Sequence, residues 1–220
     1  MSGQKIFIHK DWDDHRLESA VKIQVQNIQQ FQRVPRFSSA EFEKKKIPEN
    51  LFKFLLGKMD LASSFAEPCA PSAHINCTPR DRVAEYIPLQ DVMLVRSTLD
   101  EFLRPIVEEW SETKLEFSET YGVRRYKHGA RLALHVDKIE THIISVILNL
   151  SQNVSTPWDL FILNSDREVN RILLHPGEMI LFESARLPHG RQDPLDGESY
   201  DNLFLHFRPV GWFGRDIDSE

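Results

Sequence analysis

The sequence predicts an α+β fold in which a mainly helical first half, residues 1–113, packs against an antiparallel β-core, residues 114–220. Before residue 113, apolar residues recur three and four positions apart, which is the spacing of one helix face. From Lys114 on, short runs of strand-forming residues follow one another with turns but no helical segment between them. Strands connected in this way build an antiparallel sandwich or barrel. We expect the two halves to form one structural domain.

Three helices are expected in the first half. Residues 12–34 and 89–112 carry apolar side chains at helical spacing, and residues 47–62 begin with proline and acidic residues, as helix N-termini do. Pro105 is expected to bend or divide the third helix, because proline cannot donate a backbone hydrogen bond. The segment 62–87 is rich in Pro, Ser and Ala, so we interpret it as a long loop that serves as a lid.

The second half contains six runs with the composition of strands. Turn residues such as those of "NSD", "HPGE" and "DPLDGE" separate several of them. The runs cover residues 114–129, 131–138, 142–152, 158–165, 170–184 and 200–210. Strands of this size with no helices between them favour an antiparallel sandwich or barrel over βαβ units.

The composition excludes several classes of protein. With 220 residues, 41% of them hydrophobic, the chain can bury a sizeable core, which excludes a disordered or fibrous protein. No apolar run reaches the roughly 18 residues of a membrane span, and the polar N-terminus lacks the apolar centre of a signal peptide. We therefore expect a cytoplasmic protein without membrane contact. A net charge of −6 argues against general nucleic-acid binding, and the basic run 44–46 is interpreted as a solvated surface.

The two cysteines, Cys69 and Cys77, lie on either side of His74. A structural zinc site needs four ligands, and no fourth ligand is evident near this segment. Ordinary loop thiols are therefore the simpler interpretation, and a zinc site is the alternative. Two cysteines are also too few for a disulfide framework of the kind that secreted domains use.

A candidate metal site lies in the stretch "RLALHVDKIETH", residues 131–142. Side chains alternate faces along a strand, so His135 and Asp137 point the same way and can reach one metal ion. This pair is a weak signal until a third ligand is found. His189 is the best placed of the other histidines, because it directly follows one β-run and precedes the last one. Two imidazoles and one carboxylate, with other positions open, form the set that holds Fe(II) for oxygen chemistry.

At this point the sequence resembles a known family, the Fe(II)/2-oxoglutarate-dependent dioxygenases, and within it the prolyl 4-hydroxylase-like branch. The resemblance rests on "YKHGARLALHVD", on "HPGEMILFES" before His189 and on the closing run "YDNLFLHFRP", and it covers residues 114–210. It implies a double-stranded β-helix core, also called jelly-roll or cupin-like, with Fe(II) held by His135, Asp137 and His189. It further implies hydroxylation of a substrate C–H bond with 2-oxoglutarate and O2 as cosubstrates, succinate and CO2 as co-products, and ascorbate as an optional reductant.

One position departs from the family pattern. The family carries an arginine or lysine in the last core strand that binds the far carboxylate of 2-oxoglutarate, whereas residues 198–200 of this chain are Glu, Ser and Tyr. A buried carboxylate needs a charged or multiply hydrogen-bonded partner. Arg191 is our first choice for that partner, because a guanidinium can bind a carboxylate through two hydrogen bonds.

Other residues near the motif supplement or replace Arg191 in this role. Tyr126 is similar to the family tyrosine that donates its hydroxyl to the cosubstrate, and Ser199 or Tyr200 would add a hydrogen bond. The alternative cations are Arg131, Arg125 and Lys127. Arg124, Arg125 and Arg131 have a second interpretation as surface charges, and the sequence does not separate the two.

Three further side chains have a structural interpretation. His142 and His206 lie in strand-like runs, and we interpret them as hydrogen-bonded core or rim residues rather than as ligands. Trp158 is assigned to packing, because a large aromatic side chain buries more area than most others.

The resemblance leaves the substrate open. A peptidyl proline is the nearest expectation, but relatives of this fold also act on free amino acids, small metabolites and nucleobases. The partner is therefore a peptide, a protein or a small molecule, and the oligomeric state is left open. The alternative function is a metal-binding, cupin-like protein without oxygenase activity, either an isomerase or a binding module. The missing basic residue at 198–200 favours this alternative.

Overall fold

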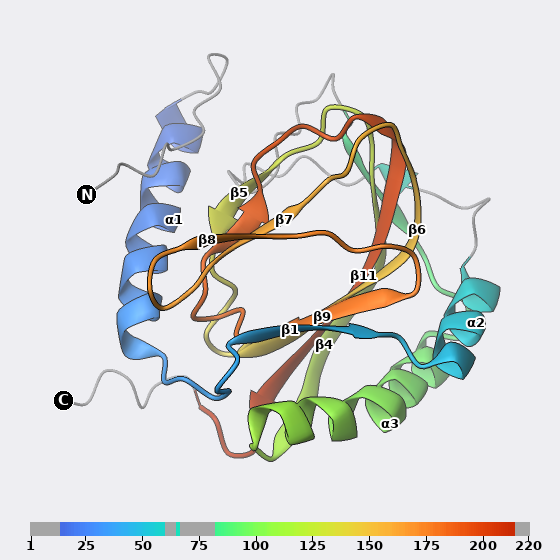
Figure 1. Cartoon of the computed structure of the whole chain (residues 1–220), viewed down its shortest axis with the longest axis horizontal. Helices are drawn as coiled ribbons and strands as arrows, with labels where there is room; N and C mark the ends of the chain where they lie inside the picture. Colours follow the sequence, from blue (N-terminus) through green and yellow to red (C-terminus); the bar gives the residue numbers. More distant parts are fainter. Residues whose placement is uncertain (1–13, 60–64, 67–81, 214–220) are drawn as a thin grey trace.

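The structure, a computed structural model, describes residues 14–59, 65–66 and 82–213 (Figure 1). Within these residues it forms three helices and eleven strands. The helices are α1 (Asp14–Arg33), α2 (Glu49–Lys58) and α3 (Val92–Ser111). The strands are β1 (Phe42–Lys46), β2 (Phe65–Ala66), β3 (Ala84–Ile87), β4 (Leu115–Tyr126), β5 (Leu132–His135), β6 (Ile144–Val154), β7 (Leu160–Leu163), β8 (Val169–Ile172), β9 (Glu178–Phe182), β10 (His189–Arg191) and β11 (Gly197–Pro209).

The strands form two antiparallel sheets. The larger sheet has the order β1-β9-β6-β11-β4-β3-β2, and the smaller sheet has the order β5-β10-β7-β8. From β4 onward the chain passes back and forth between them, with β4, β6, β9 and β11 in the larger sheet and β5, β7, β8 and β10 in the smaller one. This alternation is the topology of a double-stranded β-helix, and the predicted α+β fold class is confirmed.

Apolar side chains fill both the space between the sheets and the outer face of the larger sheet. Ile147, Ile180 and Phe182 of the larger sheet pack against Leu160 and Ile162 of the smaller one. On the outer face, α2 and α3 cover β4, β6 and β11, and α1 lies alone beside β5 (Figure 1). The residues that α2 and α3 bury there are Leu51, Leu55, Val95, Leu99, Leu103 and Val107. The helices therefore pack on the β-core, as predicted.

The first half contributes more strand than the sequence indicates. The basic run 44–46 belongs to β1, an edge strand of the larger sheet, in which Lys44 and Lys46 both form ion pairs with Glu178. Residues 84–87, at the end of the expected loop, form β3 and pair with β4. Helix α3 continues through Pro105 without division. Three strands from before residue 113, β1, β2 and β3, extend the larger sheet, so the predicted boundary at residue 113 divides the sequence but not the sheet.

Some expectations lie outside the described residues. These are the zinc alternative at Cys69, His74 and Cys77 and most of the expected lid at 62–87. Among the helices that the structure describes, none combines the length and the apolar content needed to cross a bilayer.

Candidate metal centre

The pairing of two short strands brings the three predicted ligands together. His135 is the last residue of β5, and Asp137 follows it after one residue. His189 is the first residue of β10, which pairs with β5 so that His189 lies opposite His135. The strands approach closely at Gly190, where an added Cβ would lie 2.6 Å from the carbonyl oxygen of Leu132. Only glycine therefore fits beside His189 at this point.

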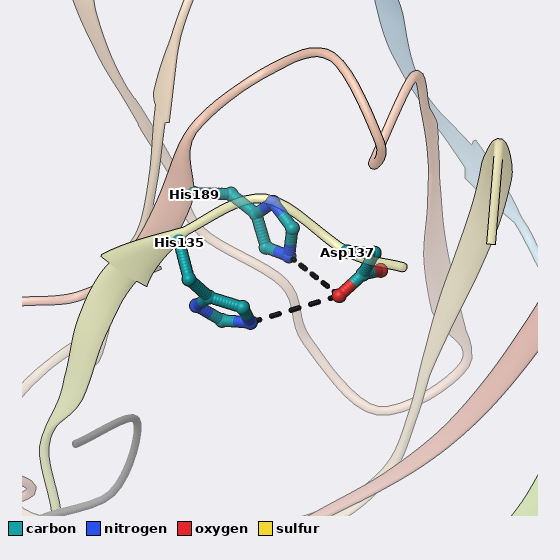
Figure 2. Close-up of side chains that lie close together, drawn as sticks. All are labelled: His135, Asp137 and His189. Atoms are coloured by element: carbon teal, nitrogen blue, oxygen red, sulfur yellow. Dashed lines mark ion pairs between the residues drawn. The ribbon is translucent and has the colours of Figure 1, made fainter. Parts of the chain in front are cut away.

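The three side chains converge on one point (Figure 2). The Nε2 atoms of His135 and His189 are each 3.7 Å from the same oxygen, Oδ1 of Asp137. The nearest potential ligand atoms of the three residues all lie within 4.8 Å of one another, and the group is the one His, Cys, Asp and Glu cluster of this kind among the described residues. The structure thus brings together the ligand set that the sequence predicts.

Main-chain carbonyls orient both imidazoles. Nδ1 of His135 lies 2.8 Å from the carbonyl oxygen of Ala133, and Nδ1 of His189 lies 2.9 Å from that of Leu187. A carbonyl oxygen only accepts hydrogen bonds, so each Nδ1 carries the proton and each Nε2 carries the lone pair. Both lone pairs are then directed at the side of the site where Asp137 lies.

Burial and neighbouring charges set the protonation states that a metal ion requires. Burial, together with the positive charge that His189 would carry, lowers the pKa of His135 to about 4. Burial alone would raise the pKa of Asp137, but the surrounding imidazoles, that of His189 foremost, lower it below its ordinary value. At neutral pH the site therefore presents a neutral imidazole at His135 and a charged carboxylate. Two nitrogen donors and one carboxylate oxygen fit an Fe(II) ion with open positions.

A second histidine pair lies next to Asp137 and is hydrogen-bonded as the sequence predicts. The rings of His142 and His206 stack with their centroids 3.6 Å apart. Nδ1 of His206 is 2.6 Å from Oγ of Ser145, and the same hydroxyl is 3.3 Å from Oδ2 of Asp137. Nδ1 of His142 is 2.6 Å from Oγ1 of Thr141. Hydroxyl groups therefore contact ring nitrogens of both histidines in this second pair. The Ser145 hydroxyl also contacts Oδ2 of Asp137, the carboxylate oxygen that does not face His135 and His189.

Deeper between the sheets, Arg191 is buried in an aromatic box. Its guanidinium lies 4.3 Å from the ring centroid of Trp158 and 4.5 Å from that of Tyr200. The side chain is among the largest fully buried ones, at 2% exposure. One terminal nitrogen donates to the carbonyl oxygen of Trp158, and the other has no hydrogen-bond partner within the part of the chain that the structure describes. Among the described residues, no carboxylate forms an ion pair with Arg191.

The other predicted cosubstrate residues, Tyr126, Ser199 and Arg131, differ in their position relative to this box. Tyr126 belongs to it, because its ring is buried and packs edge-on against Trp158 with centroids 5.1 Å apart. Ser199 precedes Tyr200 on β11, and consecutive strand residues face opposite sides, so its side chain is directed away from the box. Arg131 is half-buried in the turn before β5.

Two of the alternative cations are engaged elsewhere. Arg125 forms a bidentate pair with the buried Asp201, with N–O distances of 2.8 and 2.7 Å. Lys127 forms an ion pair with Glu85. Both carboxylates already neutralise these charges, which leaves Arg191 as the better-placed candidate.

The structure also reveals residues whose role near the site the sequence does not indicate. The guanidinium of Arg124 lies 5.4 Å from the ring of Phe204 and donates to the hydroxyl of Tyr126 at 3.4 Å. Its spacing of two from Tyr126 was the available signal, since it places both on one strand face. Trp158, assigned to packing, both packs and stacks on Arg191. Gln30 of α1 donates to the carbonyl oxygen of Asp137, a contact that no local sequence pattern predicts.

Comparison with known proteins shows similarity of fold. No protein-family model and no curated protein sequence matches the chain. Among solved structures, a Pseudomonas putida prolyl-4-hydroxylase superimposes over 83% of this chain and 100% of its own, with a TM-score of 0.53 and 16% identity. A prolyl hydroxylase from Trichoplax adhaerens, in complex with a peptide fragment of hypoxia inducible factor, covers 85% of this chain and 92% of its own, with a TM-score of 0.54 and 14% identity.

A third similar structure has a different kind of ligand. HygX from Streptomyces hygroscopicus, with nickel, 2-oxoglutarate and hygromycin B bound, covers 78% of this chain and 84% of its own, with a TM-score of 0.54 and 13% identity. The chain therefore has the double-stranded β-helix fold of these oxygenases. The predicted resemblance to the prolyl 4-hydroxylase-like branch is confirmed at the level of the fold.

Proposed function

We propose that this protein is an Fe(II)- and 2-oxoglutarate-dependent oxygenase that hydroxylates a C–H bond of its substrate. The observation that carries the proposal is the convergence of two imidazole Nε2 atoms on Oδ1 of Asp137, each at 3.7 Å. His135, Asp137 and His189 would hold the metal. Bound Fe(II) would couple the oxidative decarboxylation of 2-oxoglutarate by O2, which yields succinate and CO2, to insertion of the second oxygen atom into the C–H bond.

The residues of the chain orient the ligands and maintain their charge states. The carbonyls of Ala133 and Leu187 hold both rings with Nε2 toward Asp137, so that no rotation of the rings is needed on binding. Phe182 packs edge-on against the ring of His189 and shields that side from water. Because Asp137 supplies a carboxylate ligand, hydroxylation is favoured over halogenation, which would need that position for a halide.

We assign Arg191 as the residue that binds the far carboxylate of 2-oxoglutarate. A guanidinium buried without a carboxylate leaves a charge that is costly in the interior, and an anionic ligand would neutralise it. Arg191 follows His189 by two residues on β10, a span of about 7 Å, which is comparable to the length of a five-carbon dicarboxylate. Tyr126, in the same aromatic cluster, supplies a hydroxyl for a second hydrogen bond. This buried charge supports the oxygenase over a cupin-like metal-binding protein without oxygenase activity.

The substrate class follows from the similar structures only as a proposal. Two of them are prolyl hydroxylases, one with a bound peptide, and HygX has a small molecule, hygromycin B, bound. A peptidyl proline is our first candidate for the substrate of this chain. A small-molecule substrate is the second.

Anaerobic absorption spectroscopy tests the metal and the cosubstrate together. Adding Fe(II) and 2-oxoglutarate to the wild-type protein should produce the visible charge-transfer band of the chelate, and admitting O2 with a substrate should yield succinate. Asp137→Ala should lose the band, whereas His175→Ala, which alters an exposed turn histidine, should keep it. Iron that binds without a band at saturating 2-oxoglutarate would contradict the proposal and favour the cupin-like alternative.

Replacement of Arg191 tests the assignment of the cosubstrate anchor. Arg191→Met keeps an unbranched apolar side chain but removes the charged guanidinium, so the affinity for 2-oxoglutarate should fall by about 30-fold or more while Fe(II) affinity is unchanged. The matched control is Arg171→Met, because Arg171 also lies over an aromatic ring, that of Phe161, in the smaller sheet but is exposed. An unchanged affinity for 2-oxoglutarate in Arg191→Met would show that another residue is the anchor.

A further inference from the structure

Two of the three candidate ligands lie at an open edge of the fold. Among the described strands, the order of the smaller sheet leaves β5 at its edge, paired on one side only, with β10. An edge strand presents main-chain groups that no neighbouring strand satisfies. His135 ends β5, and Asp137 lies beyond its end, so the orientation of both depends on what holds this edge.

Helix α1 lies beside this edge (Figure 1), and two of its amide side chains reach the main chain there. Asn27, which is 2% exposed, donates from Nδ2 to the carbonyl oxygen of Leu134 at 2.9 Å. Gln30 donates from Nε2 to the carbonyl oxygen of Asp137 at 2.9 Å. Residues three apart share one helix face, so both amides reach the edge together. They take the place that a neighbouring strand would occupy.

Gln30 also connects the two halves of the metal centre. The same Nε2 donates to the carbonyl oxygen of Ala185 at 2.7 Å, and Ala185 lies in the segment that leads into His189. A primary amide has two N–H hydrogens, and each has one carbonyl acceptor here. The backbone N–H of Asp137 donates to the carbonyl oxygen of Ser184 in the same segment at 2.9 Å. Asp137 is therefore held from one side by residue 184 and from the other by Gln30.

We infer that Gln30 is a positioning residue of the metal centre. Its amide fixes the backbone of Asp137 relative to the segment before His189, and so keeps Oδ1 of Asp137 directed at both Nε2 atoms. Loss of the amide leaves two carbonyls without this donor and the carboxylate without its support on the helix side. The identity of the metal rests on the proposed function, but the positioning applies to any divalent ion that the three ligands hold.

The experiment is an anaerobic titration with Co(II), whose visible spectrum reports ligand number and geometry, on the full chain without cosubstrate. Gln30→Ala should weaken Co(II) binding by about 10- to 100-fold and change the spectrum, as is typical when a partner of a metal ligand is lost. Gln30→Lys, which keeps a long hydrogen-bond donor, should recover part of the affinity. Gln29→Ala removes the same side chain from an exposed position and should bind as the wild type does.

A second control separates positioning from general support of the fold. Ile23 is buried on the same face of α1 but contacts neither ligand segment through a hydrogen bond, so Ile23→Ala should lower thermal stability while Co(II) affinity and spectrum stay near those of the wild type. Equal losses of Co(II) affinity in Ile23→Ala and Gln30→Ala would overturn the inference, as would wild-type affinity in Gln30→Ala or a wild type that binds no Co(II). Failure of the proposed function would appear separately, as a wild type that binds Co(II) but gives no band with Fe(II) and 2-oxoglutarate.

Discussion

Two pairs of buried histidines lie beside Asp137, and only one pair has the arrangement of metal ligands. His135 and His189 direct their Nε2 atoms at Oδ1 of Asp137. His142 and His206 stack on each other on the side of Oδ2, and His206 Nδ1 is 3.8 Å from that oxygen. Both pairs are close to the same carboxylate, so proximity does not distinguish them.

The difference between the pairs is the partner of each ring nitrogen. The Nδ1 atoms of His135 and His189 face main-chain carbonyls, which only accept, so the tautomer is fixed and Nε2 carries a lone pair. The nitrogens of the second pair face hydroxyls of Thr141, Ser145 and Tyr121, which can donate or accept. A fixed tautomer directed at a carboxylate therefore marks a ligand, and hydroxyl partners mark a supporting residue.

The largest expected effect is the loss of Fe(II) affinity when a histidine of the ligand pair is replaced, compared with the same replacement in the second pair. His189→Ala removes a donor atom, so Fe(II) affinity should fall by more than the about 10- to 100-fold typical of an outer partner. His142→Ala should lower it by less than that, because no nitrogen of His142 is directed at the ligand oxygen of Asp137. Anaerobic Fe(II) titration of both variants measures the difference. Equal losses of Fe(II) affinity in both variants would show that the two pairs do not differ as ligand pair and supporting pair.

A smaller effect is expected on acidification, to which one histidine of each pair, His135 and His206, should contribute in the same direction. Burial lowers the pKa of His135 to about 4 and that of His206 to about 3, below the value of about 6.5 in an unfolded chain. The unfolded state then binds more protons between these values, so the free energy of unfolding should fall as the pH drops from 6.5 toward 4. The slope is about 1.4 kcal/mol per pH unit for each histidine.

Urea denaturation of the metal-free protein at several pH values measures this slope. His206→Gln should reduce it by about 1.4 kcal/mol per pH unit, because one protonation step is removed. Saturating metal should oppose the acid effect through His135 but leave the contribution of His206. A slope unaffected by His206→Gln would mean that the second pair is not buried in its neutral form.

Particular residues show which parts of the fold could be predicted. The alternation along residues 131–138 and the turn-separated runs after Lys114 follow from local periodicity, and the structure has strands in those regions. Strand β1 was missed because its run of charged residues lacks an apolar pattern, and its lysines are stabilised by Glu178, far along the chain. Strand β3 was missed because its four residues lie at the end of a segment rich in loop-forming residues.

The candidate site also has a part that the sequence predicts and a part that depends on the tertiary structure. Its three candidate ligands were predicted because strand periodicity places His135 and Asp137 on one face, and because His189 follows one β-run and precedes the last one. The structure adds that His189 opens β10 and lies opposite His135. Among the basic residues, the sequence favoured Arg191 but left Arg131, Arg125 and Lys127 as alternatives, because all four lie in strand-like or turn sequence near the motif or near His189. Only the tertiary structure pairs Arg125 with Asp201 and Lys127 with Glu85.

The sequence by itself determined the identity and order of the candidate metal ligands, the class of the fold and the absence of a basic residue at 198–200. These properties depend on residue type and on spacing along the chain, which are local. The tertiary structure decided which cation is buried without a carboxylate partner among the described residues, and which helix supports the ligand turn. Arg191 in its aromatic box and Gln30 on α1 owe their positions to contacts between segments far apart in sequence. Such contacts leave no periodic signal, because they arise only when the sheets and helices have packed.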